Sequence, residues 1–139
     1  MIQRIQTIYL LLAGIAAGFP LALPIGYQQQ ASGTLVEVMI SQFLPAMIVT
    51  ALAAFIALIS IFLFKKRGLQ MKTTIAALLL SLTALSMLLV NIFILQKDLV
   101  QTPNYIPLAM SFFSVVFCGL AYKGIKSDEQ LVRSMDRLR

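Results

Sequence analysis

The side chains that could carry out acid–base or metal chemistry are few in this chain. Its 139 residues include no histidine, one cysteine (Cys118) and five carboxylates. Without histidine the commonest general base and the commonest metal ligand are missing, and no nucleophile stands at a motif spacing from a base. Glu37 and Asp98 fall in two polar segments that could approach each other, but two solvated carboxylates make a weak metal site. We therefore expect a non-enzymatic protein without a metal or other cofactor.

The elements that must position these residues are apolar. Only 12% of the chain is charged and its mean hydropathy is +0.91, whereas about a quarter of a soluble domain is charged. Four uncharged stretches can span a membrane: residues 5–25, 38–64, 73–95 and 106–122. The first could instead be a cleaved signal sequence, but its apolar run favours a retained helix. The second is long enough to tilt or to begin as an interfacial turn before Pro45.

The distribution of basic residues predicts the orientation of the spans. One side holds Arg4, Lys65, Lys66, Arg67, Lys72, Lys123, Lys126, Arg133, Arg137 and Arg139, and the other holds only Lys97. Because cytoplasmic loops carry the excess of Lys and Arg, we expect both termini to be cytoplasmic. The net charge of +6 then suits anionic lipid, and we expect no nucleic-acid partner.

Small residues recur at helical spacing in every span, which predicts one all-α four-helix bundle. The candidates are Gly14, Gly18 and Ala22, then Ala46, Thr50 and Ala54 with Ala53 and Ala57, then Ala77, Ser81 and Ala84, and finally Ser111, Ser114, Cys118 and Ala121. The Gly14–Gly18 pair could pack inside the bundle or form a homodimer. Asn91, the most polar side chain within a span, could clamp a neighbouring helix or contact a ligand.

Hydroxyl groups give the only sign of a transport path. The spans contain no ionisable Asp, Glu, Lys, Arg or His, although such groups usually mark ion and proton paths. They do contain Thr50, Ser60, Ser81, Thr83, Ser86, Ser111 and Ser114. A continuous inward lining of these hydroxyls would favour transport, whereas hydroxyls scattered around all helix faces would count against it.

The last fourteen residues, KSDEQLVRSMDRLR, have the pattern of a short amphipathic helix. Ser127 and Gln130 have the spacing of a capping box, which predicts a helix start at Ser127. Leu131, Met135 and Leu138 then share one narrow apolar face. That face could contact lipid, a protein partner or the chain's own bundle, or the tail could be a solvated topology anchor. The candidate interaction face is made of Lys65, Lys66, Arg67, Lys72, Lys123, Lys126, Leu131, Arg133, Met135, Arg137, Leu138 and Arg139.

Both ends of the chain resemble one known family. The stretches at residues 1–15 (MIQRIQTIYLLLAGI) and 121–139 (AYKGIKSDEQLVRSMDRLR) are similar to small four-span inner-membrane proteins from Bacteroidota, the domain-of-unknown-function family 4293. The shared closing pattern falls on Lys126, Asp128, Glu129, Leu131, Val132, Ser134, Asp136, Arg137, Leu138 and Arg139. The resemblance implies four helices and an inner-membrane location, and it implies no activity.

The sequence thus predicts a four-span bundle at residues 1–126 and a cytoplasmic tail helix at residues 127–139. We expect an accessory or scaffold protein that contacts membrane lipids and docks a partner through its basic face and tail, or forms a homo-oligomer. The alternatives are a small oligomeric transporter or channel for a neutral or hydrophobic solute, or a lipid-binding module.

Overall fold

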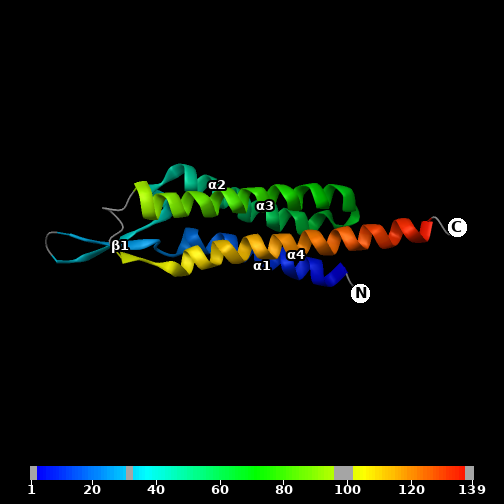
Figure 1. The fold of residues 1–139 in the computed structure, drawn as a ribbon, viewed down its shortest axis with the longest axis horizontal. Coiled ribbons are helices and arrows are strands. Elements are labelled where there is room, and N and C mark those ends of the chain that lie inside the picture. The colour runs from blue at the N-terminus through cyan, green and yellow to red at the C-terminus, as the bar shows by residue number, and fades with distance from the viewer. Residues whose placement is uncertain (1–2, 31–32, 96–101, 137–139) are drawn as a thin grey trace.

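The chain folds into an antiparallel bundle of four helices with a small sheet at one end, in a computed structural model that describes residues 3–30, 33–95 and 102–136 (Figure 1). Each helix packs against two neighbours: α1 and α3 each contact α2 and α4. The helices are α1 (Gln3–Ala22), α2 (Leu44–Phe62), α3 (Arg67–Val90) and α4 (Tyr105–Asp136). This cyclic arrangement gives every helix one face toward the bundle interior.

All four helices are long and apolar enough to cross a membrane. The apolar stretches are Ile5–Ala22, Leu44–Phe62, Arg67–Ile94 and Tyr105–Val132. Large apolar side chains cover the outside of the bundle, such as Phe55, Leu79 and Phe112, each more than half exposed. A soluble protein does not expose so much apolar surface. The four predicted spans therefore coincide with four helices that are long and apolar enough to cross a membrane, which suggests a membrane protein.

The interior of the bundle consists mainly of small side chains. The buried residues of α2 are Ala46, Thr50, Ala53, Ala57 and Ser60, and those of α3 include Ala77, Ser81 and Ala84. On α4, Ser111, Ser114, Cys118 and Ala121 are buried. Small side chains let helix backbones approach closely, which is how helices gain packing energy in lipid. The faces predicted for these three helices are therefore confirmed, with Ala53 and Ala57 rather than Ala54 at the centre of the α2 face.

The face predicted for α1 is partly wrong. Gly14 is buried, and an added Cβ would lie 2.6 Å from Leu58 of α2, so it packs inside the bundle. Gly18 is only half-buried with nothing within 4 Å of such a Cβ, and Ala22 is exposed. The buried face instead contains Leu10, Ala13 and Ala17. Ala13 and Ala17 repeat at four residues just as Gly14 and Gly18 do, so spacing alone could not choose between the two faces.

The ends of the helices also differ from the ends of the predicted apolar spans. A single 3₁₀ turn, η2 (Leu63–Lys65), joins α2 to α3, and α3 already begins at Arg67 rather than at residue 73. Residues 67–72, which lie between the predicted spans 38–64 and 73–95, are therefore the start of a helix. The second span does begin with a turn before Pro45: η1 (Ile40–Gln42) precedes α2.

The segment predicted as a polar loop, residues 27–37, forms a β-hairpin. Strands β1 (Gly26–Gln29) and β2 (Leu35–Val38) pair antiparallel, and β3 (Thr102–Pro103) adds to the other edge of β1 in the order β2-β1-β3. Gly33 takes a φ of 80° in the connecting turn, where a residue with a Cβ would be strained. The hairpin extends past the helix ends (Figure 1). We call this end of the bundle the sheet end.

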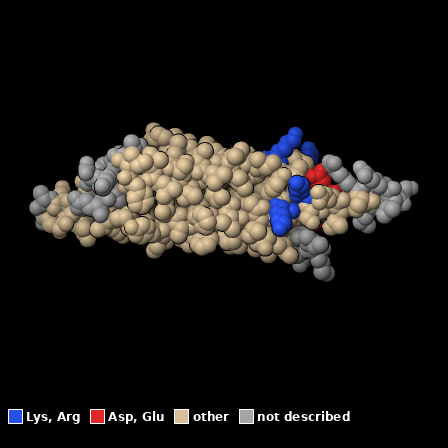
Figure 2. Space-filling view, viewed as in Figure 1, with Lys and Arg blue, Asp and Glu red and all other residues tan. Residues whose placement is uncertain are grey.

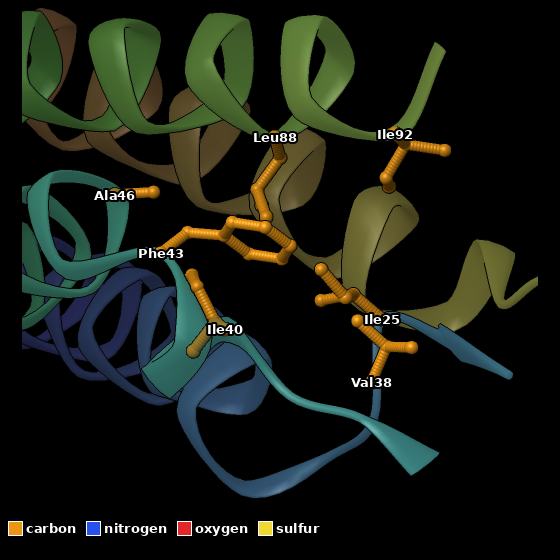
Figure 3. Packing of buried hydrophobic residues seen from close by; sticks show 7 residues of the cluster. All are labelled: Ile25, Val38, Ile40, Phe43, Ala46, Leu88 and Ile92. Atoms are coloured by element: carbon orange, nitrogen blue, oxygen red, sulfur yellow. The ribbon is translucent and has the colours of Figure 1, made fainter. Parts of the chain in front are cut away.

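An apolar cluster lies where the sheet meets the helices (Figure 3). Its buried members are Ile25, Val38, Ile40, Phe43, Ala46, Leu88 and Ile92. Asn104 fastens the start of α4 beside it: the side-chain Nδ2 donates to the Pro24 carbonyl at 3.0 Å, and Oδ1 accepts from the Ile106 N–H at 3.1 Å. Asn104 thus caps α4 and ties it to the end of α1.

Candidate functional site

Lys and Arg side chains gather around one end of the bundle, opposite the sheet (Figure 2). We call this the basic end. Its described members are Lys66, Arg67, Lys72, Lys123 and Lys126, contributed by α3, α4 and the turn before α3. The four lysines are exposed, and Arg67 is half-buried. The bundle therefore brings residues far apart in the chain onto one positively charged surface.

The predicted tail helix is not a separate element. α4 runs without a break from Tyr105 to Asp136, and its last turns project past the other helices (Figure 1). Ser127 lies inside this helix, so the prediction of a capping box and a helix start at Ser127 is wrong. No proline separates the spanning part of α4 from the tail. Gly124 lies between them, but a single glycine is tolerated within a helix. Residues 127–136 are thus a continuation of α4.

Asp128 holds the base of this extension against the bundle. Its side chain is buried, and its Oδ2 accepts a hydrogen bond of 2.5 Å from Nε2 of Gln6 on α1. The guanidinium of Arg67 on α3 donates to the Asp128 backbone carbonyl at 3.4 Å. A buried carboxylate needs such donors to offset its loss of hydration. The contacts join α1, α3 and α4 at the point where α4 leaves the bundle.

Gly124 makes room for this contact. A Cβ added at Gly124 would lie 2.9 Å from Cγ of Gln6, so the glycine lets the Gln6 side chain lie across α4 toward Asp128. Sequence reasoning missed Gln6 as a partner. The sequence does contain a signal for this role, because Gln6 is an amide in the first turns of a mostly apolar helix, close to the predicted basic side of the bundle.

The buried face of α4 continues into the projecting part. Ser114, Cys118, Ala121, Ile125 and Asp128 are buried at spacings of four, three, four and three. The next position of the same heptad pattern is Val132, which is 42% exposed, and the adjacent Leu131 is 52% exposed. They lie one turn beyond Asp128, where the side chain of Gln6 on α1 meets this face of α4. Thus an interior-type apolar face reaches solvent.

Several residues of the candidate face cannot be placed. The side chains of Lys65, Arg133 and Met135 lie outside the described part of the chain, as do Arg137, Leu138 and Arg139 entirely. Asp98, the possible partner of Glu37, is also outside it. Among the residues that are described, the structure contains no group of three or more His, Cys, Asp or Glu side chains that could hold a metal ion.

Five of the seven hydroxyls singled out from the sequence are buried: Thr50, Ser60, Ser81, Ser111 and Ser114. Thr83 and Ser86 are exposed. Most buried hydroxyls donate to a carbonyl of their own helix, as Thr50 does to Ala46 at 2.7 Å, but Ser114 donates to the Ala13 carbonyl of α1 at 3.0 Å. The cavity among them has a volume of about 10 Å³. That space is about the size of one water molecule, so the bundle is closely packed at the level of these hydroxyls.

Among the described residues, Asn91 bonds within its own helix rather than to a neighbouring one. Its Nδ2 donates to the Met87 carbonyl of the preceding turn at 2.8 Å. Asn91 begins the π-helical turn η3 (Asn91–Leu95) that follows α3, and it lines an open cavity between α2 and α3. Within the described residues, the prediction that Asn91 clamps a neighbouring helix is therefore wrong.

A comparison with protein families assigns the chain. The family model of DUF4293, a domain of unknown function, matches residues 2–138. The chain belongs to this family. Comparisons with curated proteins and with solved structures found no match. In this DUF4293 member, Asp128 of the closing motif is the buried partner of Gln6, whereas Leu131 and Val132 of the same motif are the exposed apolar pair.

Proposed function

We propose that this DUF4293 protein is a non-enzymatic scaffold of a bacterial cytoplasmic membrane, which docks a protein partner on its basic end. The excess of Lys and Arg at that end supports a cytoplasmic orientation of both termini. The few titratable groups and the absence of histidine from the sequence agree with a role in binding rather than catalysis.

The observation that carries the proposal is that the apolar face of α4 extends beyond the ends of the neighbouring helices. α4 has 32 residues and α2 has 19, which correspond to about 48 and 28 Å of helix. Leu131 and Val132 lie in the excess length. A partner helix that takes the place left by α1 and α3 would bury them, and acidic residues beside its apolar face would match Lys66, Lys123 and Lys126.

The direction of α4 favours a protein over lipid as the occupant. An interfacial helix lies in the membrane plane, whereas α4 continues along the bundle axis (Figure 1). With the bundle upright in a bilayer, Leu131 and Val132 would stand away from the hydrocarbon. Asp128 and its contact with Gln6 fix this direction.

The test is in-cell crosslinking followed by mild-detergent purification of tagged variants. Leu131→Asp should abolish co-purification of a stoichiometric partner while the protein still inserts. Gln130→Asp is the matched control: it adds the same charge at the preceding exposed position, about 100° around α4 from Leu131, and should retain the partner. A truncation after Gln130 keeps Asp128 and should behave as Leu131→Asp. If all variants capture the same proteins as the parent, the docking proposal is wrong.

The inward hydroxyls favour a second candidate function, passage of water or a very small neutral solute through the bundle. It requires the cavity of about 10 Å³ between Thr50, Ser81 and Ser114 to widen. Stopped-flow shrinkage of proteoliposomes tests it. Transport predicts faster shrinkage than in empty liposomes and a loss of this difference in Ala53→Leu, which fills the cavity.

A further inference from the structure

A large cavity lies at the sheet end, far from the proposed docking face. It has a volume of about 580 Å³ and opens between the start of α2 and the end of α3. Leu44, Met87 and Val90 contribute apolar walls, and Gln42, Ser86 and Asn91 contribute polar groups. The volume lies in the range of about 300–1,000 Å³ that is typical of small-molecule sites.

The residues around the cavity indicate that it faces membrane lipid. Leu44 and Ser86 belong to stretches long and apolar enough to cross a membrane. The exposed neighbours Leu44, Val90 and Ile94 are apolar, and Ile94 is 70% exposed. The cavity is thus continuous with the lipid-facing surface of the bundle, and the molecules that reach it first are membrane lipids.

The polar groups of the cavity lie toward one end. Gln42 stands in η1 before α2, and Asn91 stands where α3 changes to the π-helical turn η3, a feature often found at functional sites. Asn91 uses Nδ2 for the Met87 carbonyl, and its amide oxygen has no protein donor among the described residues. Met87 and Ser86 lie deeper, toward the middle of α3. An amphiphile would meet amides at the sheet end and apolar walls below.

We propose that this cavity binds one membrane phospholipid, with an acyl chain between α2 and α3 and the glycerol ester region at Gln42 and Asn91. The walls of an open cavity of this size make few dispersion contacts with each other across it. An acyl chain restores those contacts, and Gln42 and Asn91 supply hydrogen-bonding groups for the ester region.

The chain offers a matched pair of variants on α3. Ser86 lines the cavity and Thr83 does not. Both are exposed, and each donates its hydroxyl to a carbonyl three residues earlier, at 2.8 Å. Ser86→Trp should fill the cavity, whereas Thr83→Trp places the same indole on the helix surface. Exposed positions tolerate a large apolar side chain in lipid, so both variants should fold.

The experiment reconstitutes the three proteins in nanodiscs of phosphatidylethanolamine and phosphatidylglycerol that contain a phosphatidylethanolamine with a diazirine in its acyl chain. After photolysis we expect crosslinks concentrated at Leu44, Met87 and Val90, reduced at least fivefold in Ser86→Trp and unchanged in Thr83→Trp. Native mass spectrometry should show one retained lipid per chain in the parent and in Thr83→Trp only.

Three results would overturn the proposal. The first is labelling spread evenly over the four helices, which indicates only bulk lipid contact. The second is an equal yield in the two tryptophan variants. The third is a protein–protein crosslink at residues 86–90, which would assign the cavity to a second copy of the chain. None of these results bears on the docking face, because Leu131 lies at the other end of the bundle.

Discussion

The two ends of the bundle are closed in different ways. At the sheet end, seven buried apolar residues pack beneath three paired strands, and Asn104 fastens α4 to the end of α1. At the basic end, the closing contacts are polar and few: Gln6 and Arg67 both bind Asp128, and α4 then continues alone. In the first arrangement the apolar cluster is buried, with the open cavity between α2 and α3 beside it. The second leaves Leu131 and Val132 uncovered.

This difference suggests a division of roles between the ends. Apolar packing between chain segments far apart in sequence stabilises the bundle. The sheet end contains one such cluster of large apolar side chains. A polar contact gives less net stability but fixes a direction, since a hydrogen bond constrains distance and angle. The basic end therefore orients a projecting helix, whereas the sheet end packs the strands against α2 and α3.

The largest expected effect comes from breaking the sheet end. Phe43→Ala should lower the free energy of unfolding by about 3 kcal/mol, because it leaves a cavity beside Leu88 and Ile92. Unfolding in mild detergent can be followed by maleimide labelling of Cys118, which is buried and is the only cysteine in the sequence. Phe55→Ala is the control, because Phe55 is 61% exposed. Equal destabilisation by both variants would contradict the role assigned to the cluster.

A smaller effect is expected at the basic end. Asp128→Ala should cost about 1–2 kcal/mol, because it leaves Nε2 of Gln6 without its acceptor. Asp128→Asn retains an acceptor oxygen and should recover part of this loss, and Ser127→Ala, at an exposed neighbouring position, should have little effect. In the same labelling assay, Gln6→Ala should lower the free energy of unfolding less in the Asp128→Ala background than in the parent. Additive losses would show that the two side chains do not interact.

The smallest effect is expected midway between the ends. Ser114→Ala removes a hydrogen bond to the Ala13 carbonyl and should cost about 0.6 kcal/mol, the average for such bonds between membrane helices. Circular dichroism during an SDS titration suits this variant, because Ser114 lies one turn from Cys118. Thr83→Ala, which removes only an exposed hydroxyl bond within one helix, should be near neutral. A loss above that of Asp128→Ala would place the main polar contact in the middle of the bundle instead.

Much of the helical fold could be predicted because its signals are local. Four uncharged stretches specify four helices, since a chain in lipid must satisfy its backbone hydrogen bonds internally. The buried faces of α2, α3 and α4 followed from small residues at helical spacing. The basic end followed from the count of Lys and Arg on each side of the spans, although its place on the cytoplasmic side stays a prediction.

The errors arose where two local patterns competed. Ser127 and Gln130 match a capping box, but α4 does not end before them, so Asp128 is free to turn inward to Gln6. On α1, Ala13 and Ala17 repeat at the same interval as Gly14 and Gly18. The hairpin of β1 and β2 was missed because its strands are four residues each and carry glutamines rather than an alternating apolar pattern.

The sequence by itself determined that this protein has four apolar helices, which of their faces carry small residues, and where its positive charge is concentrated. These properties depend on neighbours within a few residues. Only the tertiary structure decided which α1 face is buried, that Asp128 meets Gln6 across 122 positions, and that the apolar face of α4 continues where its neighbours stop. Such pairings depend on the relative lengths and offsets of separate helices, which no local pattern encodes.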